Sequence, residues 1–313
     1  MKKSFLLFTI LSIFGFTNAT QNQTNIKANL PALGISNEKL KNIDSLNKNQ
    51  TNIAFFGVDR RNTSDFGNSD IIMIISIDSQ TKKIKLSSIM RDTYVNIYAR
   101  GKNKINTAYL EGGPQLAIRT LNENFNMAIQ DYISVDFFGS AKIFQALGGA
   151  KIDVKQEELE FINNYLSEIA GIDKVPAKHI TKPGLQLLDG KQIVAYSRIR
   201  AVGNGDYGRI QRQKTVMEAL LSNLQNKRKE DLIPIILTDV LPNIETNLNY
   251  ADLYKICTNM MNSESKTLEH ARFPLDKASK GIIIDKIWYL STDLQSTTKS
   301  LHDFIYKDIH PNN

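Results

Sequence analysis

Four arginines lie in one short stretch, residues 196–213, around a glycine-rich turn that carries a single carboxylate, Asp206. A guanidinium stays charged at physiological pH and presents a planar fork of donors that suits phosphate. If the four converge on one site, they predict a ligand with more than one negative charge, such as a diphosphate. A solvated basic helix end, or a patch for nucleic acid, is the alternative. The four are Arg198, Arg200, Arg209 and Arg212.

The residues that follow the glycine-rich turn have helical spacing. If the segment after Gly208 is helical, Arg209, Arg212 and Gln213 stand at i, i+3 and i+4 and share one face. The apolar residues that follow, among them Ile210 and Met217, fall on another stripe that would face the core. The period of residues 185–196 fits neither a helix nor a strand clearly. Arg198 and Arg200 therefore lie at the end of one or the other.

Two carboxylates, Asp59 and Asp70, flank one polar loop, each at its junction with an apolar strand. Two carboxylates, completed by ligand phosphates and water, are a usual way to hold Mg²⁺. A third strand ends at Arg91 and Asp92, so charged residues collect beside strand ends, where open α/β sheets bind ligands. The alternatives are turn or capping roles for the aspartates, or plain ion pairs that involve Arg60 and Arg91.

The elements that must position these residues alternate along the chain. Apolar runs predict strands at 53–57, 71–77, 84–89, 132–135, 151–154 and 281–289, with a tight turn joining the second and third. Amphipathic patterns predict helices after 112–114 and at 137–147, 157–169, 249–261 and 300–306, while 232–241 fits either type. The alternation predicts an α/β fold with helices packed on a mixed sheet.

The amino-acid composition excludes several classes of protein and site. The 313 residues are 42% hydrophobic and carry a net charge of +7, which fits a globular protein with anionic partners. A single cysteine, Cys257, excludes an internal disulfide framework and a cysteine-rich zinc site. The four histidines are scattered, and no nucleophile elbow or P-loop motif is present.

The N-terminus has the pattern of an export signal. Lys2 and Lys3 precede an apolar run at 5–16 and a small-residue site near Ala19. We expect a signal peptide or signal anchor at 1–19, a polar linker at 20–50 and a single folded domain at 51–308. The body of the protein would then lie outside the cytoplasm, which argues against nucleic acid as a partner.

Five blocks, taken together and in this order, resemble the LytR–CpsA–Psr family of cell-wall glycopolymer ligases. The resemblance is firm over about residues 51–217, and NIETNL at 243–248 resembles a later family segment. It implies a three-layer α/β/α sandwich around a mixed β-sheet. The blocks are GVDRR at 57–61, NSDIIMI at 68–74, SSIMRDTYVNI at 87–97, KINTAYLEGGP at 104–114 and YSRIRAVGNGDYGRIQRQ at 196–213.

The resemblance implies a phosphotransferase outside the membrane, at the membrane surface, that moves a glycopolymer from a polyprenyl diphosphate carrier onto peptidoglycan. Asp59 and Asp70 would ligate Mg²⁺. Arg91 would also be catalytic, and either Asp92 or Asp206 would orient or deprotonate the incoming sugar hydroxyl. Apolar helices would supply a tunnel for the prenyl chain. The residues that would hold the diphosphate are Arg60, Arg91, Arg198, Arg200, Arg209, Arg212 and Gln213.

The chain departs from the family pattern at three positions. Met90 stands where proline is frequent, Asn68 where a basic residue is common, and Ile71 where threonine is frequent. These changes affect loop stiffness and supporting hydrogen bonds rather than the charged set. Two further functions use the same arginines: a non-catalytic binder of polyprenyl phosphates, and a hydrolase of the diphosphate carrier with water as the acceptor.

Overall fold

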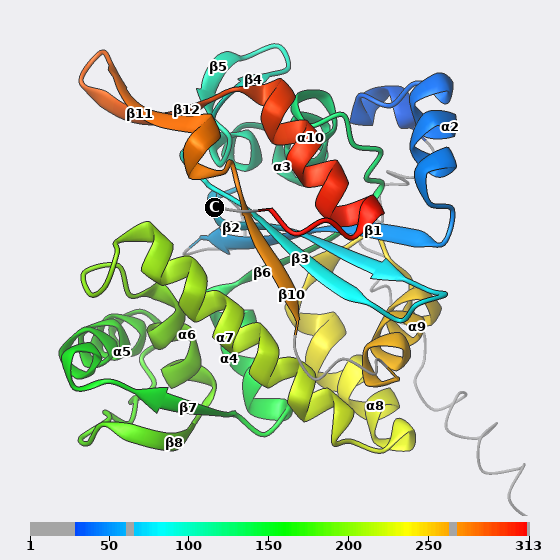
Figure 1. The fold of residues 1–313 in the computed structure, drawn as a ribbon. Coiled ribbons are helices and arrows are strands. Elements are labelled where there is room, and N and C mark those ends of the chain that lie inside the picture. The colour runs from blue at the N-terminus through cyan, green and yellow to red at the C-terminus, as the bar shows by residue number, and fades with distance from the viewer. Residues whose placement is uncertain (1–28, 61–65, 263–267, 312–313) are drawn as a thin grey trace, which may run out of the picture.

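The computed structural model of the protein describes residues 29–60, 66–262 and 268–311. They form three layers, with a central sheet between two layers of helices (Figure 1). The sheet has the strand order β10-β3-β2-β1-β6-β9. Its strands are β1 (Gln50–Asp59), β2 (Asn68–Asp78), β3 (Ile84–Ile89), β6 (Asp131–Asp136), β9 (Glu245–Thr246) and β10 (Glu269–Phe273). The predicted α/β/α sandwich is confirmed.

Strand β1 lies inside the sheet, antiparallel to β2 and parallel to β6. Strand β3 is antiparallel to β2 and parallel to β10, so the sheet is mixed. Helices cover both faces, which explains why β1 and β2 read as near-continuous apolar runs. Alternate residues of β1 serve different cores: Ala54, Phe56 and Val58 face one, and Ile53 and Phe55 the other.

The upper layer in Figure 1 packs on the first of these cores around Tyr109, Phe125 and Phe304. Two hairpins extend from it, and the short turn η6 (Asp276–Ala278) precedes the second. Its helices are η2 (Leu30–Leu33), α2 (Asn37–Leu46), α3 (Thr107–Asn124) and α10 (Leu294–Lys307), and the hairpins are β4–β5 (Tyr94–Ile97, Gly101–Lys104) and β11–β12 (Ser279–Ile284, Ile287–Thr292).

The lower layer covers the other face of the sheet (Figure 1). It comprises α4 (Phe137–Ala146), α5 (Leu159–Asp173), α6 (Gly190–Arg198), α7 (Asp206–Gln225), α8 (Lys229–Ile235), the π-helical turn η4 (Ile236–Val240) and α9 (Tyr250–Met261). The hairpin of β7 (Ala150–Val154) and β8 (Gly184–Leu188) lies outermost. The short turns η3 (Gln156–Glu158) and η5 (Leu241–Asn243) complete this layer.

The structure corrects two predictions. Residues 30–46 of the expected linker are largely helical, because Leu33, Ile35 and Ile43 are buried and anchor this polar stretch to the core. Residues 281–289 are not one strand but belong to the β11–β12 hairpin, which turns at residues 285–286. Gly112 and Gly113 have non-helical backbone angles and kink α3, so that Pro114 opens its second part as predicted, while the first part, from Thr107, was not predicted.

Residues 185–196 divide into β8 and the start of α6, which explains their unclear period. Residues 232–241 are helical, and Arg198 lies at a helix end. The expected leader at 1–19 falls outside the described residues. Within the described ranges, no helix combines the length and apolar character needed to cross a membrane.

Candidate active site

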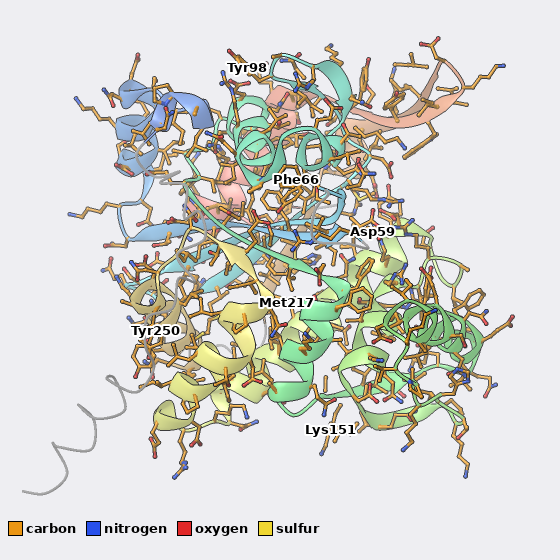
Figure 2. All side chains as sticks on the ribbon, turned by 180° about the vertical axis from the view of Figure 1, so that it is seen from behind. Asp59, Phe66, Tyr98, Lys151, Met217 and Tyr250 are labelled. Atoms are coloured by element: carbon orange, nitrogen blue, oxygen red, sulfur yellow. The ribbon has the colours of Figure 1, made fainter. Side chains whose placement is uncertain are left out.

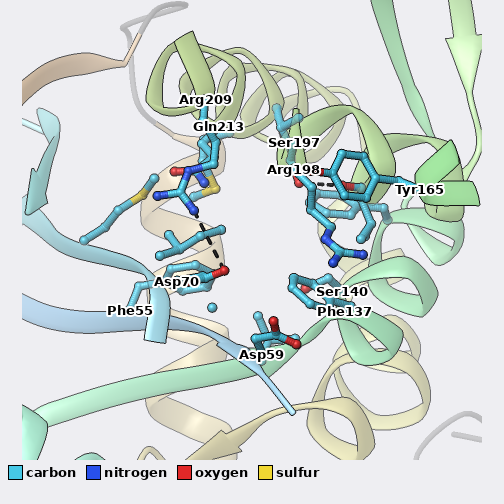
Figure 3. Close-up of a pocket in the computed structure, with 18 of the residues that line it drawn as sticks. Phe55, Asp59, Asp70, Phe137, Ser140, Tyr165, Ser197, Arg198, Arg209 and Gln213 are labelled. Carbon is cyan, nitrogen blue, oxygen red and sulfur yellow. Dashed lines mark hydrogen bonds and ion pairs between the residues drawn. The ribbon is translucent and has the colours of Figure 1, made fainter. Parts of the chain in front are cut away.

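A pocket opens on the lower side of the sheet, where β1 and β2 meet helices α4, α6 and α7 (Figure 3). It encloses about 910 Å³ of empty volume. Its strand side carries Asp59 and Asp70, and its helix side carries Arg198, Arg209 and Gln213. The other lining residues are Phe55, Gly57, Ile71, Met73, Val135, Phe137, Ser140, Phe144, Tyr165, Val194, Ser197, Arg200, Val216 and Met217.

A β-bulge directs Asp70 into this pocket. Gly57 pairs with Ile71 and Val58 pairs with Ser69, so Asp70 is the extra residue between two pairs. Regular alternation would send neighbouring side chains to opposite faces of the sheet. Because the bulge re-aims the strand, both Asp70 and its neighbour Ile71 line the pocket.

Three guanidinium groups and two carboxylates form the centre of the site. Arg91 donates to Asp70 Oδ1, and Arg200 Nη2 donates to Asp70 Oδ2 at 2.9 Å. Arg209 Nη2 donates to Asp206 Oδ2 at 2.9 Å. The remaining approaches are longer: Arg209 Nη1 to Asp70 at 3.9 Å, Arg91 Nε to Asp206 at 3.9 Å, and Arg200 Nε to Asp206 at 3.8 Å. Each carboxylate is thus surrounded by the same three arginines.

Three guanidinium cations and two carboxylates form this centre, and a third carboxylate, Asp92, lies 3.5 Å from Arg91 Nε at its edge. Burial alone would raise the pKa of Asp70, but Arg91, Arg200 and Arg209 outweigh it and lower that pKa. Burial, together with the neighbouring arginines, lowers the pKa of Arg209. The Nε atoms of all three arginines are buried and make no hydrogen bond within the described residues. These donors suit an anion.

The three arginines lie in or beside turns of the chain. Arg91 follows β3, where the Thr93 hydroxyl donates to the Met90 carbonyl at 2.6 Å. Arg200 lies in the loop between α6 and α7, and Arg209 in the first turn of α7. Gly203 and Gly205 have φ values of +78° and +57°, a conformation that favours glycine, and so allow this tight return.

Arg198 stands apart from the centre but lines the same pocket. Its guanidinium carbon lies 4.3 Å from the ring centroid of Phe137 and 4.6 Å from that of Tyr165. It also donates to Glu168 at 3.3 Å. Two aromatic faces attract the cation and fix its position. No sequence pattern indicates that Phe137 and Tyr165 belong to the site, because both lie outside the arginine stretch.

Arg212 and Arg60, two of the predicted diphosphate ligands, are not brought into the pocket. Arg212 donates to the buried carboxylate of Glu158 at 2.7 Å and to the Ile199 and Val202 carbonyls at 3.3 and 3.2 Å. It therefore holds the loop that carries Arg200. Arg60 forms ion pairs with Asp136 at 3.2 Å and Glu245 at 3.6 Å.

The two candidates for the base have different surroundings. Asp206 begins α7 and faces the arginine centre. Asp92 is buried and accepts from Lys104 Nζ at 2.6 Å, with Arg91 Nε 3.5 Å away. Asp92 also supports the site through its backbone, because its carbonyl accepts from Leu290 N at 2.9 Å.

A second, apolar cavity of about 1040 Å³ adjoins the pocket and shares five lining residues with it, among them Phe55, Phe144 and Met217. Met217 lies below the sheet among the lower helices (Figure 2). Ser140 and Cys257 are the polar residues in its lining, and burial raises the pKa of the Cys257 thiol to about 11. The rest of the wall is hydrocarbon or thioether, contributed by β1, β2, β6, α4, α7, α8, η4 and α9.

The metal prediction concerns Asp59 and Asp70. Both line the pocket from neighbouring strands (Figure 3). Across the described ranges, no three histidine, cysteine or acidic side chains form a metal cluster by themselves. Two carboxylates fit a Mg²⁺ that takes its remaining oxygen ligands from a phosphorylated substrate and water.

Comparison with known proteins places the chain in a family. The profile of the LytR_cpsA_psr family matches residues 13–303. A polyisoprenyl-teichoic acid–peptidoglycan teichoic acid transferase, TagU of Oceanobacillus iheyensis, is 32% identical over 261 residues, which is 80% of this chain and 75% of that protein. Regulatory protein MsrR of Staphylococcus aureus is 31% identical over 211 residues, or 67% of this chain and 60% of MsrR.

Solved structures agree in fold. The crystal structure of Bacillus subtilis TagV is 25% identical, superposes with a TM-score of 0.65, and is matched over 84% of this chain and 99% of TagV. A structure of TagT with bound octaprenyl pyrophosphate lipid has a TM-score of 0.62 at 20% identity, over 84% of this chain and 92% of TagT. The chain therefore belongs to the LytR–CpsA–Psr family.

Proposed function

We propose that this protein transfers a glycopolymer, with its attached phosphate, from a polyprenyl diphosphate carrier to a sugar hydroxyl of peptidoglycan outside the cytoplasm. One observation carries the proposal. A cluster of arginines whose Nε atoms make no hydrogen bond among the described residues lies in and around a pocket that shares five lining residues with an apolar cavity. A prenyl diphosphate has the same division, with an anionic head and a hydrocarbon tail.

The head would occupy the arginine centre. Arg91, Arg200 and Arg209 now contact Asp70 and Asp206, whose carboxylates occupy positions where phosphate oxygens would also be stabilised. Arg198, fixed between its two rings, and Gln213 would contact the head from the helix side. The tail would fill the apolar cavity. The TagU relative and the lipid-bound TagT structure are consistent with this ligand class.

In the reaction, the acceptor hydroxyl attacks the phosphorus nearer the glycan. The new P–O bond makes a phosphodiester, and the bond to the bridging oxygen breaks, so that the lipid phosphate leaves. Such transfers depend on positioning and charge neutralisation more than on a protein nucleophile. The arginines stabilise charge on both phosphates. The energy is stored in the diphosphate, so no nucleotide is needed.

The proposed reaction also uses a magnesium ion and a general base. Asp59 and Asp70 would hold a Mg²⁺, which would supply further charge neutralisation at the phosphates. Asp206 is favoured over Asp92 as the group that orients the hydroxyl and accepts its proton, because it faces the arginine centre. Asp92, held by Lys104, would then keep the Arg91 turn in place. Arg212 is a positioning residue for the Arg200 loop.

The test uses the full chain, a synthetic polyprenyl diphosphate disaccharide and peptidoglycan fragments, with products followed by mass spectrometry. We expect a disaccharide-phosphate adduct on the glycan that is lost in Arg200→Ala and after removal of Mg²⁺ by EDTA. Arg228→Ala is the matched control, because Arg228 is 72% exposed and remote in sequence from every arginine of the site. Release of disaccharide phosphate without an adduct would identify a hydrolase, and tight lipid binding without turnover a carrier or regulator.

A further inference from the structure

Part of the wall of the apolar cavity is a single helical segment, α8 with the π-helical turn η4, at the lower side of the fold (Figure 1). Leu232 and Ile236 are each 1% exposed and line the cavity, as do Ile235 and Val240. The inner face of this part of the wall is therefore hydrocarbon.

The outer face of the same segment carries exposed apolar side chains. Ile233 is 42% exposed and Leu237 is 50% exposed, and Pro234 between them is exposed as well. These positions, i, i+1 and i+4, form one stripe along a helix. Single exposed apolar residues are ordinary, but these two lie on the outer side of a segment whose inner side lines an apolar cavity.

Polar groups lie at both ends of this stripe. At the start of α8, Arg228 pairs with Asp231 at 2.8 Å and with Glu230 at 3.4 Å. At the other end, the Thr238 hydroxyl lies 2.9 Å from the Pro234 carbonyl and 2.6 Å from Asp239 Oδ2. The outer face of the segment is therefore a short apolar stripe between two polar ends.

The segment is an irregular helix. Pro234 removes one backbone donor from α8, and η4 replaces the usual i→i+4 ladder with a π-helical turn. A prenyl tail moves most readily from one hydrocarbon environment to another, because passage through water exposes its whole apolar surface. Among the elements that line the cavity, α8 and η4 carry large exposed apolar residues.

We propose that the outer face of α8 and η4, centred on Ile233 and Leu237, rests on the lipid bilayer and that the prenyl tail passes through it into the cavity. The identity of the lipid rests on the proposed function. The occupant of the stripe is the acyl region of a bilayer, not a protein partner, because the surface it covers continues into a cavity for the same kind of hydrocarbon.

The first arm of the test measures membrane contact at single sites. In the full chain, Cys257→Ala removes the one cysteine, and a fluorophore is attached at Leu237→Cys or, as the control, at Ile283→Cys. Ile283 is 73% exposed on β11, in the upper layer and away from the cavity (Figure 1). Vesicles of phosphatidylglycerol and phosphatidylethanolamine carry nitroxides on their acyl chains. We expect quenching at position 237 and little at 283, since any N-terminal tether is the same in both. Equal quenching, or none at 237, would overturn the inference.

The second arm separates this inference from the proposed function. Leu237→Glu and Ile283→Glu are compared with the donor lipid supplied either in vesicles or in detergent micelles. We expect Leu237→Glu to slow transfer from vesicles while micellar transfer persists, and Ile283→Glu to slow neither. If the two variants transfer equally from vesicles, the inference is wrong. The unsubstituted chain could fail to transfer the glycan from either lipid source while position 237 is still quenched. That result would contradict the proposed function and support the membrane contact.

Discussion

Replacing Arg212 tests whether an arginine of the ligand-like stretch has a structural role. Its side chain and that of Glu158 are 9% and 6% exposed, and they share a 2.7 Å charged hydrogen bond. Arg212 also satisfies two backbone carbonyls of the Arg200 loop. Arg212→Met would leave a buried carboxylate without its cation and both carbonyls without this donor. Removal of one partner of a buried pair costs about 3–5 kcal/mol.

That loss corresponds to a fall in Tm of roughly 10 °C for a chain of this size. Thermal unfolding measures it, and calorimetric titration with a short-chain prenyl diphosphate measures binding below the transition. Glu158→Gln is the milder control, because an amide oxygen can still accept from Lys155 N, now 2.9 Å away. We expect Arg200→Ala to show the opposite pattern: little change in Tm, and binding weakened by about 10- to 100-fold as a charged hydrogen bond is lost.

The interpretation would be refuted if Arg212→Met unfolded like the unsubstituted protein and lost affinity as strongly as Arg200→Ala. Arg212 would then be a ligand of the diphosphate, as its spacing from Arg209 first suggested. A double variant of Arg212 and Glu158 adds a check. If the two side chains interact as the structure has them, the combined loss in stability is smaller than the sum of the single losses.

Two further predictions concern His270 and Phe137. Burial, with Lys214 and Arg272 contributing, lowers the pKa of His270 to about 4. The unfolded chain, with a histidine pKa of about 6.5, then binds more protons below that value, so stability falls on acidification, by about 2 kcal/mol between pH 7 and 5. Urea unfolding at both pH values should show this loss reduced in His270→Asn, and an unchanged loss would contradict it. Phe137→Leu removes one ring beside Arg198, and titration should show diphosphate binding weakened several-fold; unchanged affinity would show that the ring does not position the cation.

Much of the fold was predictable from local pattern. The apolar runs at 53–57, 71–77 and 84–89 each lie within a strand of the sheet, and the tight turn between the last two does join a hairpin. The helices in the polar stretch before residue 50 were not predicted, because three buried side chains, Leu33, Ile35 and Ile43, are too few to produce a periodic signal in a sequence rich in Asn and Lys.

The site was predictable in its residue types but not in its arrangement. Helical spacing alone assigns Arg209 and Arg212 to one face, yet Arg209 enters the pocket while Arg212 turns to Glu158, a residue from a distant part of the sequence. The bulge that aims Asp70 depends on pairing with β1, which no local pattern reveals. The apolar cavity is a space between helices, and its lining residues read in sequence like ordinary core.

The fate of the donor's two phosphates tests the transfer most directly. A polyprenyl diphosphate disaccharide is prepared with ³³P only in the phosphate next to the sugar and is incubated with the full chain and peptidoglycan. The proposed reaction places the label on the peptidoglycan and leaves an unlabelled lipid phosphate. Label that stays with the lipid would mean that the sugar–oxygen bond breaks instead, and label found only in soluble sugar phosphate would mean that water is the acceptor. Either result would contradict a phosphotransfer to the cell wall.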